Sequence, residues 1–203
     1  MTPPAAFQIS QGLAPFEKAA AALLYWQAFA PKIGRVLRPD HRALFYIAHI
    51  MRPDHVIVAR DLADASVLGI AGFRSPLGAF VDGTGPDLRR AYGRFSGAWR
   101  AALLASLPHD VENKRFLLDG LVVHPHVRGQ GIGGALLGAI CAEAELRGYD
   151  AVRLEVAAAN PRARALYERV GFRVVASQTI GWQRLFFECD RTLTMVRDLH
   201  GAG

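Results

Sequence analysis

The hydrophobic and polar positions in the N-terminal part of the chain follow both helical and extended patterns. Apolar residues recur at helical spacing in two stretches, whereas three others show the alternation or the β-branched content of strands. The helices are predicted over residues 15–29 and 42–51, and the strands over residues 7–10, 55–60 and 66–73. We therefore expect a strand, two helices and two strands in this order.

Three residue types mark the expected ends and irregularities of these elements. Pro31 and Gly34 are expected to interrupt the first helix, because proline lacks the N–H that a helix interior requires. Asp40 precedes the second helix and is predicted to be its N-cap residue. Gly69 and Gly72 lie inside the third strand, where glycine indicates a bulge or a close approach by another segment.

A long connection follows these elements. Residues 75–87 are rich in glycine and proline, which predicts a loop. The next apolar residues keep helical spacing and predict one inserted helix, with an inner face of Leu88, Tyr92, Phe95, Trp99, Leu103 and Leu107. The arginines of this helix are expected on a solvated face or against an anionic ligand; they are Arg89, Arg90, Arg94 and Arg100.

The second half of the chain begins with a strand, a glycine-rich turn and a helix. Residues 117–123 form a near-continuous apolar run, typical of a strand buried on both faces, and Pro125 ends its pairing. From Ile132 the apolar residues recur at helical spacing, and Gly148 is expected to close this helix. The pattern then predicts a strand, a helix and two strands, over residues 151–156, 161–170, 172–175 and within 185–196.

The turn has the composition of an anion-binding cradle, Arg128-Gly129-Gln130-Gly131-Ile132-Gly133-Gly134. Glycine lets a ligand approach the backbone closely, and a helix N-terminus leaves N–H groups unpaired beside a partial positive charge. Such a turn suits a phosphate or pyrophosphate. Gly134 and Gly138 could instead serve close packing of the helix on a strand.

The same letters spell the G-x-G-x-x-G of a dinucleotide-binding Rossmann unit, with Asp150 and Glu155 roughly 20 residues further on. Residues 125–128, however, separate the strand from the first glycine, most of the chain precedes the motif, and too little follows for the remaining βα units. A nucleotide-dependent oxidoreductase is therefore kept only as an alternative.

The turn also closely resembles the acyl-CoA-binding signature of the GCN5-related N-acetyltransferases (GNAT). The core of that signature, Arg/Gln-x-x-Gly-x-Gly/Ala, is matched by Arg128, Gly131 and Gly133. Residues 154–172 resemble the downstream motif of the family over their whole length. The resemblance is tight over residues 116–172 and looser over the rest of the chain.

This resemblance implies a mixed, mostly antiparallel and twisted α/β sheet of about seven strands flanked by helices. The strands bearing Leu121 and Leu154 are expected to run parallel and to splay apart, so that the pantetheine arm of the cofactor enters between them. Residues 1–203 are expected to form one acyltransferase domain. Residues 74–115, with an extra helix between the third and fourth strands, are the main departure from the family and leave the substrate unassigned.

The implied reaction is transfer of an acetyl group from acetyl-CoA to a primary amine by direct attack, without a metal. The residues expected to bind the cofactor are Leu121, Val122, Val123, Arg128, Gly129, Gln130, Gly131, Ile132, Gly133, Gly134 and Asn160. Asn160 could equally be only the N-cap of the following helix. A non-catalytic acyl-CoA-binding or sensory protein of the same fold is a second interpretation.

Three residues are candidates for the chemistry. Tyr167 aligns with the tyrosine that protonates the CoA thiolate in many members of the family, although it could be only a half-buried aromatic residue. Glu155 aligns with the general base of ribosomal-protein N-terminal acetyltransferases, the members closest in motif; its alternative is an ion pair with Arg153. Asp119, on the neighbouring strand, is the other candidate base, and a water chain could replace both.

Composition limits the remaining classes of function. The net charge of +6 comes almost entirely from dispersed arginines, and no basic run is interleaved with aromatics, so nucleic acid is not expected as a partner. No apolar stretch is long enough to span a membrane, the N-terminus lacks a signal-peptide pattern, and we expect a cytoplasmic protein. Cys141 and Cys189 are expected to be buried thiols, and His124 and His126 lack a third zinc ligand nearby. The acceptor amine stays open, as does a homodimer.

Overall fold

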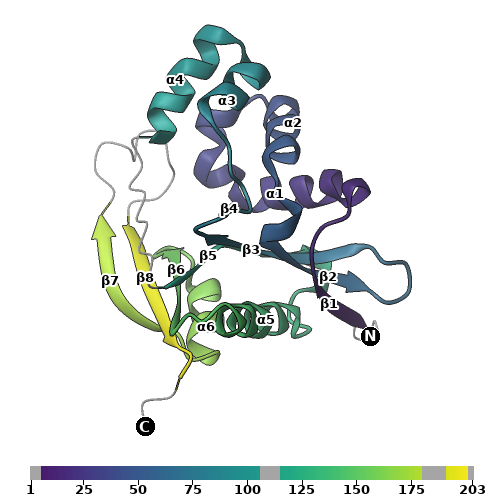
Figure 1. The fold of residues 1–203 in the computed structure, drawn as a ribbon, viewed down its shortest axis with the longest axis vertical. Coiled ribbons are helices and arrows are strands. Elements are labelled where there is room, and N and C mark those ends of the chain that lie inside the picture. Colours follow the sequence, from purple (N-terminus) through teal and green to yellow (C-terminus); the bar gives the residue numbers. More distant parts are fainter. Residues whose placement is uncertain (1–5, 106–114, 180–190, 201–203) are drawn as a thin grey trace.

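The computed structural model describes residues 6–105, 115–179 and 191–200, in which one twisted sheet separates two layers of helices (Figure 1). Its strands follow the order β1 (Phe7–Gln11), β2 (Val56–Asp61), β3 (Val67–Ser75), β5 (Phe116–Val123), β6 (Ala151–Ala157), β8 (Arg191–Asp198) and β7 (Arg173–Thr179). The short strand β4 (Gly78–Ala79) pairs with β3 outside this path. Among these described strands β5 and β6 form the one parallel pair, which confirms the mixed, mostly antiparallel sheet.

The helices form one layer on each face of the sheet. One layer contains α1 (Lys18–Leu37), α2 (Asp40–Ile50), α3 (Gly85–Tyr92) and α4 (Arg94–Ala105); the other contains α5 (Ile132–Leu146) and α6 (Pro161–Arg169) (Figure 1). Short 3₁₀ helices span Pro15–Glu17, Pro53–His55 and Pro125–Val127.

The alternation of β2 explains why the molecule has two hydrophobic cores. Val56 and Val58 pack in the core beneath α1 and α2, whereas Ile57 and Ala59 pack in the core beneath α5. Successive strand residues point to opposite faces, so a strand covered by helices on both sides is apolar throughout. The helical spacing predicted from Ile132 onward is confirmed, because the residues at that spacing in α5, Leu136, Ile140 and Ala144, are completely buried.

Two expectations about the first helices were wrong. Helix α1 does not end before Pro31 but continues to Leu37, and Pro31 lies inside it. An internal proline costs a helix about 3 kcal/mol, and burial of Val36 and Leu37 in the core offsets this cost. Asp40 is the first residue of α2, and Pro39 occupies the N-cap position.

The inserted segment forms two helices where one was expected. Gly93 separates α3 from α4 with a φ of 85°, a conformation that glycine adopts readily. The helices then pack so closely that a Cβ on Gly97 would lie 2.5 Å from the Arg89 Cα. This break changes the phase of the apolar stripe and leaves Phe95 92% exposed. Part of the predicted loop, residues 75–87, is also structured as β4 and the start of α3.

Arg100 is buried, whereas the sequence placed it on a solvated face or against an anionic ligand. Its guanidinium donates hydrogen bonds to the carbonyls of Val36 and Arg38 at 2.7 and 3.1 Å, and it lies over the Tyr92 ring. The Tyr92 hydroxyl donates to the Leu37 carbonyl. These bonds satisfy carbonyls that the end of α1 leaves without helical partners, and they fix the inserted helices to α1.

The glycines of β3 confirm the predicted close approach and the bulge. A Cβ on Gly69 would lie 3.1 Å from a methyl group of Leu136, so glycine allows α5 to pack directly on the sheet. The pairing of β3 with β5 shifts register between Gly72 and Phe73, where Asp119 is the extra residue of β5. A bulge of this kind turns the following residues to the opposite face.

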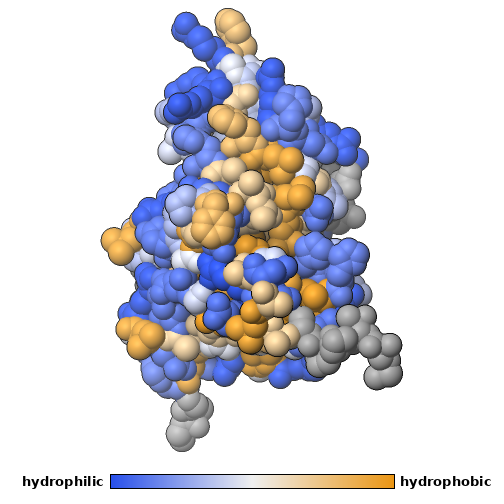
Figure 2. Space-filling view, turned by 90° about the vertical axis from the view of Figure 1, so that its right-hand side faces the viewer, coloured by the Kyte–Doolittle hydropathy of each residue, from blue (hydrophilic) through white to orange (hydrophobic). Residues whose placement is uncertain are grey.

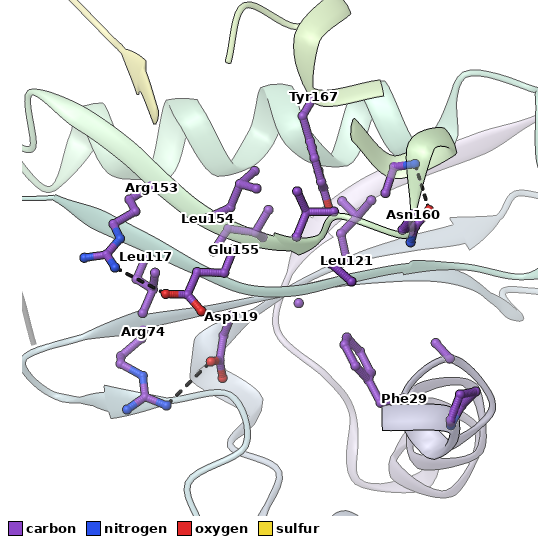
Figure 3. A pocket seen from close by; sticks show the side chains of 17 residues that line it. Phe29, Arg74, Leu117, Asp119, Leu121, Arg153, Leu154, Glu155, Asn160 and Tyr167 are labelled. Atoms are coloured by element: carbon purple, nitrogen blue, oxygen red, sulfur yellow. Dashed lines mark hydrogen bonds and ion pairs between the residues drawn. The ribbon is translucent and has the colours of Figure 1, made fainter. Parts of the chain in front are cut away.

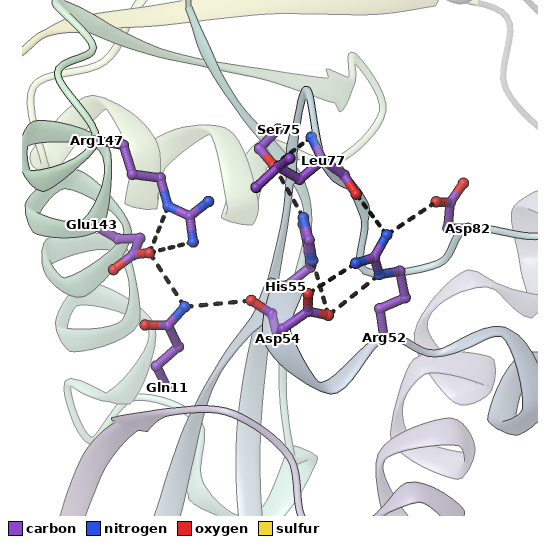
Figure 4. Close-up of polar contacts among 9 residues, drawn as sticks. All are labelled: Gln11, Arg52, Asp54, His55, Ser75, Leu77, Asp82, Glu143 and Arg147. Carbon is purple, nitrogen blue, oxygen red and sulfur yellow. Dashed lines mark hydrogen bonds and ion pairs between the residues drawn. The ribbon is translucent and has the colours of Figure 1, made fainter.

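A polar network holds the turn between β3 and β4 (Figure 4). Buried His55 contacts Ser75 through Nε2 at 3.0 Å and Asp54 through Nδ1 at 3.1 Å. Arg52 donates to the Leu77 carbonyl at 2.6 Å and pairs with Asp54 at 2.9 Å. The Arg52 guanidinium thereby lowers the pKa of Asp54 to about 2. Because these bonds pin both sides of the turn, they fix the end of β3.

Apolar side chains gather on the face of the molecule that Figure 2 shows. In Figure 2 they form a broken band between polar flanks, on the side of the molecule that lies to the right in Figure 1. Large exposed apolar side chains also occur singly, such as Leu62 at 59% and Leu77 at 75% exposure. Single exposed apolar residues are ordinary for a globular protein.

Candidate active site

The parallel strands β5 and β6 separate to form a cleft. Their pairing covers residues 116–118 and 152–154, yet β5 continues to Val123 and β6 to Ala157. This confirms the predicted splaying of the strands that bear Leu121 and Leu154. Beyond the last pair, the edge of β5 no longer bonds to β6, so the main chain of residues 121–123 borders the opening.

Two adjoining cavities fill this opening. One, of about 570 Å³, lies at the glycine-rich turn and the start of α5, and the other, of about 430 Å³, lies between β5, β6 and α1. They share the lining residues Ala28, Leu121, Asn160 and Ala163. Together they form one cleft with a glycine-rich end and a charged end.

The glycine-rich end has the backbone of an anion cradle. Gly129 and Gly131 have φ values of 86° and 85°, and a Cβ on either would meet no atom within 4 Å. Gly131 is the N-cap of α5 and provides no side-chain cap, so the first N–H groups of the helix point outward without one. The conformation, rather than crowding, therefore explains both glycines.

The other glycines of the cradle serve different purposes. A Cβ on Gly133 would lie 3.0 Å from Leu166, so this glycine lets α6 approach α5. A Cβ on Gly134 or Gly138 would meet nothing within 4 Å, which overturns the packing role suggested for these two residues. Arg128 lines the cavity and donates from Nε to the Val123 carbonyl at 3.0 Å, which holds its guanidinium at the cradle.

Asn160 lines both cavities, and Tyr167 lines the cavity at the charged end. The Asn160 side chain accepts a hydrogen bond from the Ala163 N–H at 3.1 Å, which confirms its N-cap role. Tyr167 is 7% exposed, and its hydroxyl points toward the gap between the strands (Figure 3). Burial raises the pKa of Tyr167 to about 12, so the phenol keeps its proton at neutral pH.

The charged end holds two carboxylates and two arginines from three strands (Figure 3). Glu155 pairs with Arg153 on β6 at 3.2 Å, and Asp119 on the β5 bulge lies 3.5 Å from Arg74 on β3. The Glu155 side chain is 45% exposed, while that of Asp119 is 22% exposed. Both candidate bases thus line one cavity with Tyr167, although Glu155 also has the arginine partner named as its alternative.

Sequence reasoning missed two residues of this end. Arg74 belongs to no motif, and its position is set by the pairing of β3 with β5, which the pattern of one strand does not reveal. Phe29 lines the cavity from α1 and packs on Tyr25 with ring centroids 4.4 Å apart. Gly120 faces these rings, because a Cβ there would lie 3.0 Å from Phe29.

The described residues also bear on a metal site, a membrane span and the two cysteines. The described part of the chain contains no group of three histidine, cysteine or acidic residues placed to hold a metal ion. The rings of His124 and His126 lie 5.1 Å apart. In the described ranges, no helix has the length and apolar character needed to cross a membrane. Cys141 is buried, and Cys189 lies outside the described residues.

Comparison with known proteins identifies the family. Residues 22–172 match the acetyltransferase (GNAT) family, so the chain belongs to this family and the resemblance of its motifs is confirmed. No protein of curated function matches the sequence significantly.

Solved structures share the fold at low sequence identity. An N-acetyltransferase from Staphylococcus aureus Mu50 is 17% identical, with 96% of this chain and 99% of that chain covered and a TM-score of 0.63. The ribosomal-protein-S18-alanine N-acetyltransferase from Escherichia coli is 18% identical, with 98% and 97% covered and a TM-score of 0.59. The putative acetyltransferase yncA from Salmonella typhimurium, solved with acetyl-CoA, is 19% identical, with 98% and 96% covered and a TM-score of 0.60.

Proposed function

We propose that this protein transfers an acetyl group from acetyl-CoA to a primary amine by direct attack within a ternary complex. The observation that carries the proposal is the continuous cleft, which leads from the cradle at Gly131 to the charged end at Glu155. A phosphate-binding site joined to a carboxylate and a buried phenol has what acyl transfer between a thioester and an amine requires.

The cofactor would lie along the glycine-rich end. Backbone N–H groups of residues 129–134 and the Arg128 guanidinium would hold the pyrophosphate, as oriented amides at a helix N-terminus do for other phosphates. The main chain of residues 121–123 would bond the pantetheine arm and orient the thioester carbonyl, and Asn160 would contact the same arm. The edge that β5 leaves unpaired beyond Leu118 supports this assignment.

The reaction would then take place at the charged end. The amine nitrogen attacks the carbonyl carbon of the thioester, the C–S bond breaks, and the amine loses one proton while the thiolate gains one. Glu155 would accept the proton, because its exposure lets it pass the proton to water. Tyr167 would protonate the thiolate, and Asp119 would attract the incoming amine.

No acyl-enzyme intermediate is needed in this scheme. Cys141 lies on the inner face of α5, outside the described lining of the cleft. Burial also raises the pKa of its thiol, which makes it a poor nucleophile at neutral pH. Direct attack by the amine is the simpler route.

Thermal unfolding with acetyl-CoA, CoA, NAD and NADP tests the proposal first. A ligand at about 100 times its dissociation constant adds about 2.7 kcal/mol to the free energy of unfolding, which shifts Tm measurably. We expect a shift with acetyl-CoA and CoA, followed by release of the CoA thiol when an amine is added. Binding without thiol release from any amine would indicate a non-catalytic acyl-CoA-binding protein, and a shift only with a dinucleotide would contradict the proposal.

A further inference from the structure

The charged end of the cleft is balanced between the two signs of charge. Arg74 and Arg153 lie beside Asp119 and Glu155 on the face of the sheet that α1 covers (Figure 3). A site built to attract amines alone would need only the carboxylates, since guanidinium groups repel an incoming ammonium. The two arginines therefore call for a separate explanation.

The two arginines differ in their exposure and in how they contact a carboxylate. Arg153 is buried, at 7% exposure, and donates from Nη2 to Glu155 at 3.2 Å, so it holds the proposed base. The Arg74 side chain is 34% exposed, and its Nη2 forms an ion pair with Asp119 at 3.5 Å. The Arg74 Nε is buried and has no hydrogen-bond partner among the described residues.

Arg74 is also held firmly in place. It pairs with Ala79 on one side and Leu117 on the other, and the adjacent Ser75 is fixed by buried His55 (Figure 4). A partly exposed guanidinium on a rigid strand is suited to bind a planar carboxylate through two hydrogen bonds.

We infer that the acceptor is a small amine that carries its own carboxylate, as amino acids do, and that Arg74 selects it by binding that carboxylate. The ammonium group lies toward Asp119 and Glu155, and the carboxylate lies on Arg74. This inference rests on the proposed function and narrows its substrate to amino carboxylates. Polyamines and aminoglycosides, which are polycations, do not use the arginines.

The test compares each amino acid with its own carboxamide as acceptor, by the initial rate of CoA thiol release at fixed acetyl-CoA. A panel of the common amino acids and their carboxamides is used, with spermidine and an aminoglycoside added. We expect at least one acid to have a kcat/KM roughly ten- to a hundredfold above that of its carboxamide, the range of a hydrogen bond to a charged group. The wild-type protein alone provides this comparison.

Two variants then assign the selectivity. Arg74→Met is expected to raise KM for the acid roughly tenfold or more and to remove most of the preference for the acid over its carboxamide, whereas Arg74→Lys restores part of the preference. Arg173→Met is the matched control, because it also removes an arginine from an Arg–Asp pair, with Asp198 at 2.8 Å on an exposed strand away from the cleft. This control is expected to leave kcat/KM unchanged for both the acid and its carboxamide.

Four results would overturn the inference, and three of them concern the choice of acceptor alone. A kcat/KM for carboxamides or for polycations that equals or exceeds that for the acids would exclude a carboxylate site. The same conclusion would follow if Arg74→Met lowered kcat/KM for the acid and for its carboxamide equally. These results leave the proposed function intact, because amines are still acetylated. Acetyl-CoA binding without turnover of any amine would overturn the proposed function and this inference with it.

Discussion

Leu118 and Leu154 are the last paired residues of the two parallel strands, and the cleft begins directly beyond them. Asp119, the next residue of β5, is the extra residue of the bulge against β3. The bulge and the loss of pairing thus occur within one residue of each other. The bulge turns the polar side chain of Asp119 into the cleft, and the loss of pairing with β6 opens the main chain of β5 to a ligand.

Gly131→Ala should weaken acetyl-CoA binding more than it weakens the fold. A φ of 85° strains an alanine by about 1 kcal/mol, and the added methyl group lies beside the proposed pyrophosphate. Gly148→Ala is the matched control, since Gly148 has a φ of 76° and equally open surroundings at the far end of α5. Calorimetric titration and thermal unfolding should show similar stability losses in both, but weaker binding in Gly131→Ala alone.

Tyr167→Phe should retain CoA binding. If the phenol is the general acid, the substitution should lower kcat by about 100-fold. Because the pKa of Tyr167 is about 12, its protonated form persists through the assay range, and the loss should be the same at every pH below about 10. Tyr149→Phe, which removes a hydroxyl from a ring packed on Phe116, is the control. An unchanged kcat in Tyr167→Phe would leave the tyrosine a packing role.

Glu155→Gln and Asp119→Asn should separate the two candidate bases. If Glu155 is the base, its variant should lose about 100-fold in kcat, because an amide cannot accept the proton of the amine. Asp119→Asn should mainly raise KM for the amine. The reverse pattern would assign the base to Asp119, and a normal kcat in both variants would favour a water chain.

Glu17→Gln should destabilise the fold without affecting the cleft. Buried Glu17 accepts hydrogen bonds from Arg60 at 2.6 and 2.7 Å and from the Ala14 N–H at 2.7 Å. Removing one partner of a buried ion pair lowers the free energy of unfolding by about 3 kcal/mol. The exposed pair of Glu168 with Arg164 at 2.8 Å is the control, and Glu168→Gln should cost at most about 0.5 kcal/mol.

The stability effect of Glu17 should depend on pH in a defined direction. The hydrogen bonds from Arg60 lower the pKa of Glu17 in the folded state. A carboxylate with a lowered pKa stabilises the fold above its unfolded pKa of about 4.3, and this stabilisation is lost as the pH falls through the folded value. Urea unfolding should therefore show the full difference between wild type and variant at pH 7. A difference that did not shrink at acidic pH would contradict this account.

The local chemistry of the central stretch could be predicted from its residues alone. The strand of residues 117–123, the turn at Gly129–Gly134 and the helix from Ile132 each follow from hydrophobic period, proline and glycine content. Gly131 takes the left-handed conformation and Asn160 caps α6, as these residue types prefer. Such features depend on a few consecutive residues, so neighbouring segments do not alter them.

The structural predictions from the sequence were wrong where packing outweighed local preference. Pro31 remains inside α1 because Val36 and Leu37 beyond it are buried in the core. Gly93 divides the inserted segment into two helices, although the apolar residues of that segment keep one helical period in the sequence. Arg100 is buried because the end of α1 offers it carbonyl acceptors. Each of these outcomes depends on a contact between segments far apart in the sequence.

The sequence by itself determined the family, the order of the main elements and the cradle, because motif and period are carried by residues close together in the chain. Only the tertiary structure decided the charged end of the cleft. Arg74, Asp119 and Glu155 come from three strands, and the register of β3 on β5, the bulge at Asp119 and the splaying of β6 bring them together. Register between strands is fixed by packing across the whole sheet, which the pattern within one segment does not contain.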